Sequence, residues 1–232
     1  MALPLYLAMT ALEMSSIAEI PQYSAWMACH FSPSSQGLTN LPAALPEGAV
    51  LILDDRLPCQ GHSPDLAAGQ LREAVERLGC KEVLLDFQRP PEAESLAIVK
   101  AILAALPCPA AVSEGYAREL SCPVFLPPCP LHASLEEFLA PWSEREVWLE
   151  AALCQEDVIV QPEGITYVPQ FPPAYLGDGF YDEALCCHYR TTVNESEVRF
   201  TLFDTRESLT RKLEKARSLG VSKAVGLYQE LG

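Results

Sequence analysis

A set of polar side chains, mostly carboxylates, lies within or just after the C-terminal parts of the short apolar runs of this chain. They are Asp54 and Asp55, Asp86 and Gln88, Glu114 and Tyr116, Glu150, and Tyr228 and Glu230. If the runs form parallel strands of one sheet, these residues meet at the edge where α/β barrels hold their active sites. Carboxylates crowded together there can hold raised pKa values and serve as acid or base.

These residues also have structural interpretations. The aspartates at 54–55 could end a strand in a turn, and Asp86 could bond a backbone amide or an arginine such as Arg89. Glu114 could be the first-turn acid of a helix, and Tyr228 could pack in the core or at its rim. The spacing alone leaves both interpretations open.

The sequence patterns of several other catalytic classes are missing. There is no Gly-x-Ser-x-Gly, no glycine loop that would cradle a phosphate and no His-Glu-x-x-His. The run Cys186-Cys187-His188 lacks the second close ligand pair that a metal site needs, and the other histidines lack His-x-x-x-His spacing. We therefore expect neither a metal nor a cofactor.

Eight apolar runs with little alternation predict strands that are buried on both faces, as in a parallel sheet. The runs are residues 4–9, 25–30, 49–54, 82–87, 109–113, 123–126, 146–153 and 222–228. Helical stretches separate several of them, so the pattern favours an α/β fold closed as a compact (β/α)8 TIM barrel. An open, doubly wound sheet is the alternative. We interpret Trp26, Trp142 and Trp148 as packing residues rather than sugar platforms.

Local signals predict the helices between these runs. Ser63 and Pro64 open one that continues to Leu78 and stops at Gly79. The other expected helices are residues 91–106, 134–139 and 205–219.

Residues 154–204 break the alternation and predict an irregular insertion in a single barrel domain that spans residues 1–232. We expect a loop at residues 169–180, which are rich in proline and glycine, and a hairpin that turns at residues 194–197. The strands expected here are residues 158–168, 184–193 and 198–203.

The tail carries a family likeness. Its relevant pieces are Tyr181-Asp182-Glu183, the stretch from Asp204 to Ser208, Lys212, Leu219-Gly220, Gly226-Leu227-Tyr228 and Leu231-Gly232. Residues 181–232 resemble the C-terminal segment of glycoside hydrolase family 18 barrels, the chitinase-like group. The resemblance implies a sugar site at the barrel mouth, with Tyr228 at the position of the family's indole floor.

The fourth apolar run adds to this resemblance. The family ends its fourth strand in Asp-x-x-Asp-x-Asp-x-Glu, and here residues 81–88 keep only the last aspartate, Asp86. Leu84 replaces an earlier aspartate, and Gln88 stands where the family has its proton-donating glutamate. The family's Tyr-Asp pair near the sixth strand is also absent from residues 123–128.

Three hypotheses follow. Glycosidic cleavage needs a carboxylic acid, and a glutamine amide forms hydrogen bonds but gives up no proton at neutral pH. We therefore favour a catalytically degenerate barrel that binds an oligosaccharide or small sugar. The first alternative is an active glycoside hydrolase that uses a different carboxylate, and the second is a barrel that serves protein interaction or unrelated small-molecule chemistry.

Composition narrows the choice of partners. The formal net charge of −15 should repel nucleic acid and anionic lipid, so neither is expected. No apolar stretch reaches the length of a membrane span, and the first residues read as a strand rather than a signal peptide. The nine cysteines form no Cys-x-x-Cys pair, which favours reduced core thiols and a cytoplasmic protein.

Overall fold

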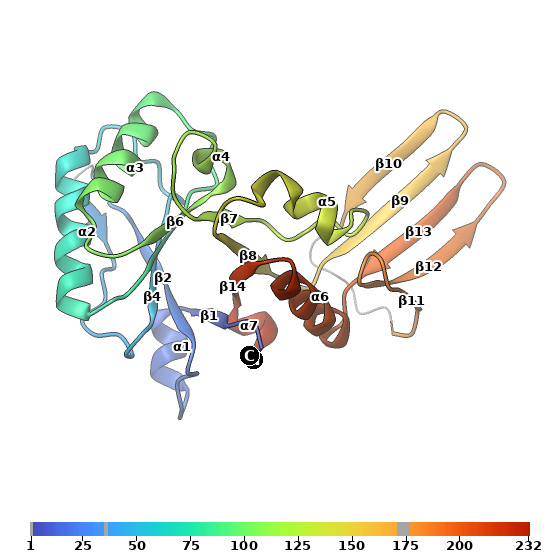
Figure 1. The fold of residues 1–232 in the computed structure, drawn as a ribbon, viewed down its shortest axis with the longest axis horizontal. Helices are drawn as coiled ribbons and strands as arrows, with labels where there is room; N and C mark the ends of the chain where they lie inside the picture. The colour runs from blue at the N-terminus through green and yellow to red at the C-terminus, as the bar shows by residue number, and fades with distance from the viewer. Residues whose placement is uncertain (1, 35–36, 171–176) are drawn as a thin grey trace.

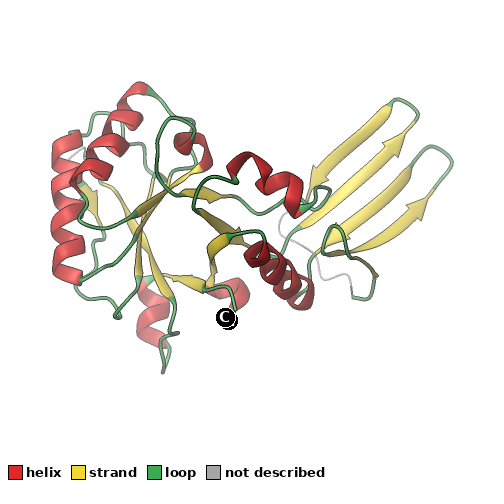
Figure 2. Cartoon of the chain, in the orientation of Figure 1, coloured by secondary structure: helices red, strands yellow, loops and turns green. Residues whose placement is uncertain are grey.

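The computed structural model describes residues 2–34, 37–170 and 177–232, and it contains a closed ring of eight parallel strands (Figures 1 and 2). Strand β1 closes the ring by pairing with both β14 and β2. The ring strands are β1 (Leu5–Met9), β2 (Ser24–Phe31), β4 (Val50–Asp54), β5 (Val83–Asp86), β6 (Ala110–Ser113), β7 (Val124–Leu126), β8 (Val147–Ala151) and β14 (Val221–Leu227). Each coincides with a predicted run, so the barrel is confirmed and the open sheet is excluded.

Helices connect the ring strands along the outside, and a short strand, β3 (Leu38–Thr39), pairs antiparallel with β2. The helices are α1 (Ala11–Ser16), α2 (Pro64–Leu78), α3 (Ala93–Ala105), α4 (Glu114–Ala117), α5 (Leu135–Leu139), a 3-10 turn (Ala140–Trp142), α6 (Arg206–Ser218) and α7 (Tyr228–Leu231). The connections after β1, β2 and β6 contain only short helices or none.

Helix α2 illustrates how sequence fixes an element. The Ser63 side chain accepts a hydrogen bond from the backbone N–H of Leu66, which caps the first turn. Leu71 and Val75 lie one turn apart and are both buried against the barrel. Gly79 ends the helix with φ of 66°, in the left-handed region that glycine adopts without strain.

Strand alternation divides the core of the barrel into two layers. Ile52, Leu84 and Trp148 belong to the apolar cluster that fills the ring. Their neighbours, such as Leu53 and Leu85, belong to the larger cluster under the helices. The packing role of Trp148 is confirmed, because its side chain is fully buried. Six of the nine cysteines are also buried, and all nine thiols are free.

The inserted segment is more regular than expected. It forms a five-stranded antiparallel sheet, ordered β10-β9-β13-β12-β11, that projects from the ring (Figure 1). Its strands are β9 (Gln155–Gln161), β10 (Gly164–Pro169), β11 (Phe180–Asp182), β12 (Cys187–Val193) and β13 (Val198–Phe203).

The hairpin that turns at residues 194–197 is confirmed by the pairing of β12 with β13. The single strand expected at residues 158–168 was wrong, because the chain reverses between β9 and β10. Pro162 and Gly164, with φ of 148°, are the turn signals that this interpretation overlooked. Of the loop expected at residues 169–180, residues 171–176 lie outside the described residues.

A buried ion pair joins the inserted sheet to the barrel. Lys212 Nζ of α6 lies 2.8 and 2.9 Å from the two carboxylate oxygens of Asp204, which follows β13. The Asp204 carboxylate also accepts hydrogen bonds from the backbone N–H of Cys154 (3.3 Å) and from Ser208 Oγ (3.2 Å). The backbone N–H of Asp204 donates to the Cys154 carbonyl at 2.8 Å, so both ends of the insertion are fixed together.

We predict that Lys212→Met lowers the free energy of unfolding by about 3–5 kcal/mol, because it leaves the Asp204 carboxylate buried without its cation. Urea unfolding at neutral pH measures this. Glu207→Ala is the control, since it breaks only the exposed Glu207–Arg211 pair and should cost less than about 1 kcal/mol. A Lys212→Met variant as stable as this control would contradict the assignment.

Candidate functional site

The ring gathers three acidic side chains at its C-terminal end. Asp54, Asp86 and Glu150 each lie two residues beyond an interior residue of the same strand, so their side chains continue the interior face. All three line one cavity of about 110 Å³, together with apolar side chains that include Phe125 and Leu227. We call this acidic end of the ring interior the mouth.

Asp86 is held within a small hydrogen-bond network. Its carboxylate accepts a hydrogen bond from Gln88 Nε2 and a second, of 3.4 Å, from Ser113 Oγ on the next strand. Burial raises the pKa of Asp86, the hydrogen bonds from Gln88 and Ser113 oppose this, and the nearby Asp54 and Asp55 add to the increase. The Asp86 side chain faces the ring interior, where it lines the cavity of the mouth.

Glu150 has the most strongly perturbed carboxyl group of the mouth. Burial raises the pKa of Glu150 to about 7, and the negative charges of Asp86 and Glu230 contribute further to the increase. No hydrogen bond is formed to the Glu150 carboxylate within residues 2–34, 37–170 and 177–232. A carboxyl group of this kind can hold a proton near neutral pH.

Two other acids of the predicted set are paired with arginines. Asp54 Oδ2 lies 2.7 Å from Nη2 of Arg56, and Arg56 Nε donates to both carboxylate oxygens, to Oδ1 at 3.1 Å and to Oδ2 at 3.0 Å. Glu114 begins α4 and lies 2.5 Å from Arg118 one turn later. Glu114 lines a second cavity, of about 240 Å³, beside Gln88 and Glu150. Both acids therefore lie near the mouth with their charges compensated.

Asp55 has the structural role that the sequence left open. Its side chain is buried, and its carboxylate accepts the backbone N–H groups of Gln88 (2.8 Å) and Arg89 (3.0 Å). Arg89 Nε also donates to the Asp55 carbonyl at 3.0 Å. The arginine proposed as a partner of Asp86 thus bonds Asp55, which fixes the loop that presents the exposed Gln88.

Two predicted site residues lie elsewhere. Tyr116 is 1% exposed and packs edge-on against Phe87, with ring centroids 5.4 Å apart, in the core outside the ring. Its position on the buried face of α4 explains the error. Tyr228 is the first residue of α7 rather than the end of β14, and its ring lies against Gly232. It lines none of the cavities at the mouth described above.

Several residues of the mouth and of its surroundings were not among those predicted from the sequence. Ser113 and Phe125 are visible as residues of predicted strands, and the period-2 alternation would have placed them in the ring interior. A larger cavity under the inserted sheet, which includes His132, Glu156 and Tyr167, gave no signal, because it forms only where distant segments meet.

Across the described ranges, no three His, Cys, Asp or Glu side chains are grouped so that they could hold a metal ion. No helix in the same part of the chain is long and apolar enough to cross a membrane.

We predict that Glu150→Gln stabilises the protein at alkaline pH. In the folded protein the pKa of Glu150 is raised from 4.5 to about 7. The stability that the neutral Glu150 carboxyl group provides is therefore fully present below pH 4.5 and is lost as the pH rises through 7. The glutamine variant should therefore gain up to about 3 kcal/mol over wild type by pH 8. Urea unfolding between pH 4.5 and 8 tests this, with the exposed Glu144→Gln as control. Parallel pH profiles for wild type and Glu150→Gln would contradict it.

Comparisons with solved structures identify proteins that share this fold. No family model and no curated protein matches the sequence. Among solved structures, the spore cortex-lytic enzyme SleL of Bacillus cereus aligns with a TM-score of 0.56 and 11% identity over 99% of this chain and 71% of its own.

Two plant chitinases align over nearly their whole length. A family GH18 chitinase of Cycas revoluta, in complex with allosamidin, has a TM-score of 0.57 and 11% identity over 97% of this chain and 94% of its own. A class V chitinase of Nicotiana tobaccum, a glutamate-to-glutamine variant in complex with NAG4, has a TM-score of 0.54 and 12% identity over 97% and 93%. The chain is therefore a divergent (β/α)8 barrel with the fold of the glycoside hydrolase family 18 chitinases.

Proposed function

We propose that residues 1–232 act as one barrel domain that binds a carbohydrate at the mouth and has lost the proton donor for hydrolysis. The observation that carries the proposal is the arrangement of Asp86 and Gln88 at the exit of the fourth ring strand. Gln88 stands two residues after Asp86, and its amide donates to the Asp86 carboxylate. An acid at that position would be the family's proton donor.

The chemistry of Gln88 separates binding from catalysis. A carboxylic acid at this position protonates the leaving oxygen of a glycosidic bond, whereas an amide has no proton to transfer at neutral pH. The same amide can donate to and accept from sugar hydroxyls. Because Gln88 is exposed beside the mouth, its second amide hydrogen and its carbonyl oxygen are accessible to a ligand.

The ligands bound in similar structures support the proposal that this chain binds a carbohydrate. The Cycas revoluta chitinase is in complex with allosamidin, and the Nicotiana tobaccum variant, which has glutamine in place of a glutamate, is in complex with NAG4. That variant, with a glutamine in place of one of its glutamates, holds NAG4. We infer that β-linked N-acetylglucosamine oligomers are the first ligands to test on this chain.

Glu150 favours a second candidate function, an active hydrolase with a relocated acid. Its pKa is raised to about 7 by burial and by the charges of Asp86 and Glu230, which is the property that a general acid needs at neutral pH. In this alternative Glu150 donates the proton from β8, and Asp86 orients the substrate from β5. Activity measurements separate the two candidates.

We predict that wild-type protein shows no measurable hydrolysis of a chromogenic chito-oligosaccharide at neutral pH, because general acid catalysis is worth roughly 10²–10⁴-fold. Gln88→Glu restores an acid beside Asp86 and should give slight turnover. The matched control is Gln22→Glu, since Gln22 is exposed before β2, at the opposite end of the ring. Robust wild-type turnover that Glu150→Gln abolishes would establish the second candidate instead.

We further predict that wild type binds chitotetraose in isothermal titration calorimetry and that Asp86→Ala weakens binding at least about tenfold. The variant removes a buried charged acceptor from the mouth, and hydrogen bonds to charged groups contribute about 1.5–3 kcal/mol. Glu144→Ala, an exposed carboxylate outside the mouth, should bind as wild type does. Equal affinities for wild type and Asp86→Ala would place the sugar elsewhere.

A further inference from the structure

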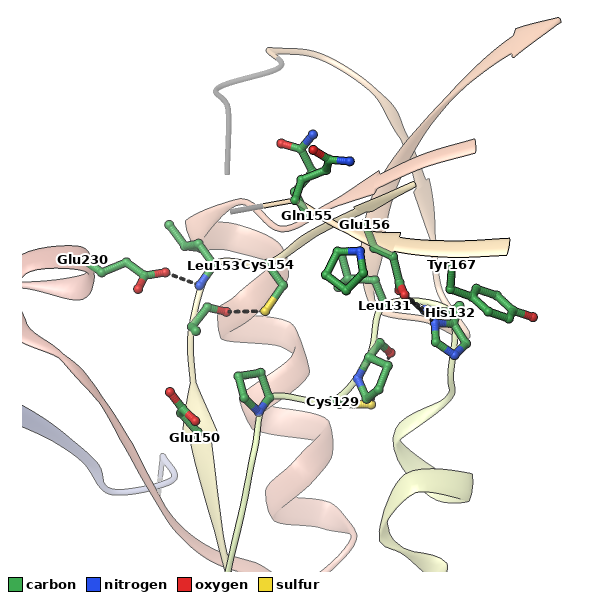
Figure 3. A pocket seen from close by; sticks show the side chains of 15 residues that line it. Cys129, Leu131, His132, Glu150, Leu153, Cys154, Gln155, Glu156, Tyr167 and Glu230 are labelled. Carbon is green, nitrogen blue, oxygen red and sulfur yellow. Dashed lines mark hydrogen bonds and ion pairs between the residues drawn. The ribbon is translucent and has the colours of Figure 1, made fainter. Parts of the chain in front are cut away.

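A cavity of about 570 Å³ adjoins the mouth beneath the inserted sheet (Figure 3). Its volume falls in the range of small-molecule sites, about 300–1,000 Å³. Its walls come from the chain after β7, from the end of β8 and the start of β9, from the inner end of β10, and from Glu230 of α7. The apolar side chains that face it include Pro128, Pro130, Leu131, Leu153, Tyr167 and Pro169.

The polar groups around this cavity are largely engaged within the protein. The Glu156 carboxylate, 6% exposed, has both oxygens 2.8 Å from Nδ1 of His132. The Tyr167 ring stacks on the His132 ring, with centroids 3.9 Å apart and an interplanar angle of 24°. Glu230 accepts the backbone N–H of Leu153. The walls therefore offer mainly apolar surface and few free hydrogen-bond partners.

Glu150 connects this cavity to the mouth. It lines both spaces, and Figure 3 shows it on the side of the cavity that lies opposite His132 and Tyr167. A ligand that is held near Asp86 and Gln88 can thus continue past Glu150 into the apolar space. Its two ends would meet different chemistry, polar at the mouth and apolar beneath the sheet.

We infer that this cavity holds the uncharged apolar aglycone of a glycoside whose sugar lies at the mouth, so the preferred ligand class is alkyl or aryl glycosides. The inference rests on the proposed carbohydrate function. A second sugar unit would bury several hydroxyls against proline and leucine, and each unpaired hydroxyl costs free energy. A free fatty acid would bring its carboxylate near Glu150 and Glu230, which disfavours an anion.

Calorimetry with methyl and hexyl β-glycosides of N-acetylglucosamine tests the inference on wild-type protein. Each buried methylene contributes about 0.8 kcal/mol, so the hexyl glycoside should bind at least about tenfold more tightly than the methyl glycoside. Hexanol and hexanoate complete the set, and hexanoate should bind more weakly than hexanol. Equal affinities of the two glycosides would overturn the inference and leave the carbohydrate function standing. Hexanol binding without any glycoside binding would overturn both.

Substitutions at the cavity test whether the tighter binding of the hexyl glycoside arises there. Ala152 is half-buried and faces the cavity, so Ala152→Phe should fill the space and abolish the advantage of the hexyl chain while methyl glycoside binding persists. The control is Thr166→Phe, which introduces the same side chain at an exposed position on the opposite face of β10 from Tyr167. Tyr167→Ala, at a half-exposed position, should reduce the hexyl advantage without disturbing the core. If the hexyl glycoside kept its advantage over the methyl glycoside in Ala152→Phe, the hexyl group would have to lie outside this cavity, and the inference would be overturned.

Discussion

The ion pair between Asp204 and Lys212 is the constraint on which the arrangement of ring, insertion and cavity depends. Both side chains are almost fully buried, with 1% and 6% exposure, so each charge needs the other. Asp204 is bonded through its carboxylate and its backbone N–H to Cys154, where the insertion begins. The pair therefore fixes the two ends of the inserted sheet and the start of α6 at one point. Helix α6 packs on both β14 and β12, so the sheet that walls the apolar cavity is held against the ring.

The mouth shows how a strongly acidic chain compensates its charges. Asp54 has an arginine partner, and Asp55 is neutralised in part by two backbone N–H groups. Asp86 has only neutral donors, and Glu150 has neither cation nor donor in the described part of the chain. The raised pKa of these two carboxyl groups follows from that difference, because burial is not offset by a cation. Carboxylates that remain uncompensated in a cavity are candidates for contact with a ligand.

Most of the ring could be predicted from the sequence, because its signals are local. Buried parallel strands appear as unbroken apolar runs, and caps such as Ser63 and Gly79 mark helix ends to within a residue. The errors arose where tertiary packing decides. Tyr116 follows a strand in the sequence but lies on the buried face of α4, in the core outside the ring, and Tyr228 begins a helix. The sequence identified Asp86 and Glu150 as acids at strand ends, but the cavity between β8 and the inserted sheet depends on contacts such as His132 with Glu156, 24 residues apart.

An amide rather than an acid at position 88 has a physical consequence for the mouth itself. Gln88 donates a hydrogen bond to Asp86, a carboxylate whose pKa is raised by burial and by neighbouring aspartates. A glutamate at this position could make the same contact only if one of the two carboxyl groups were protonated, since two carboxylates repel each other at hydrogen-bond distance. That shared proton is what an acid catalyst uses, and it is also a source of instability near neutral pH. An amide at position 88 avoids both the repulsion and the shared proton, so the contact with Asp86 forms without that electrostatic cost. In the function that we propose, this contact belongs to a sugar site that lacks the proton needed for catalysis.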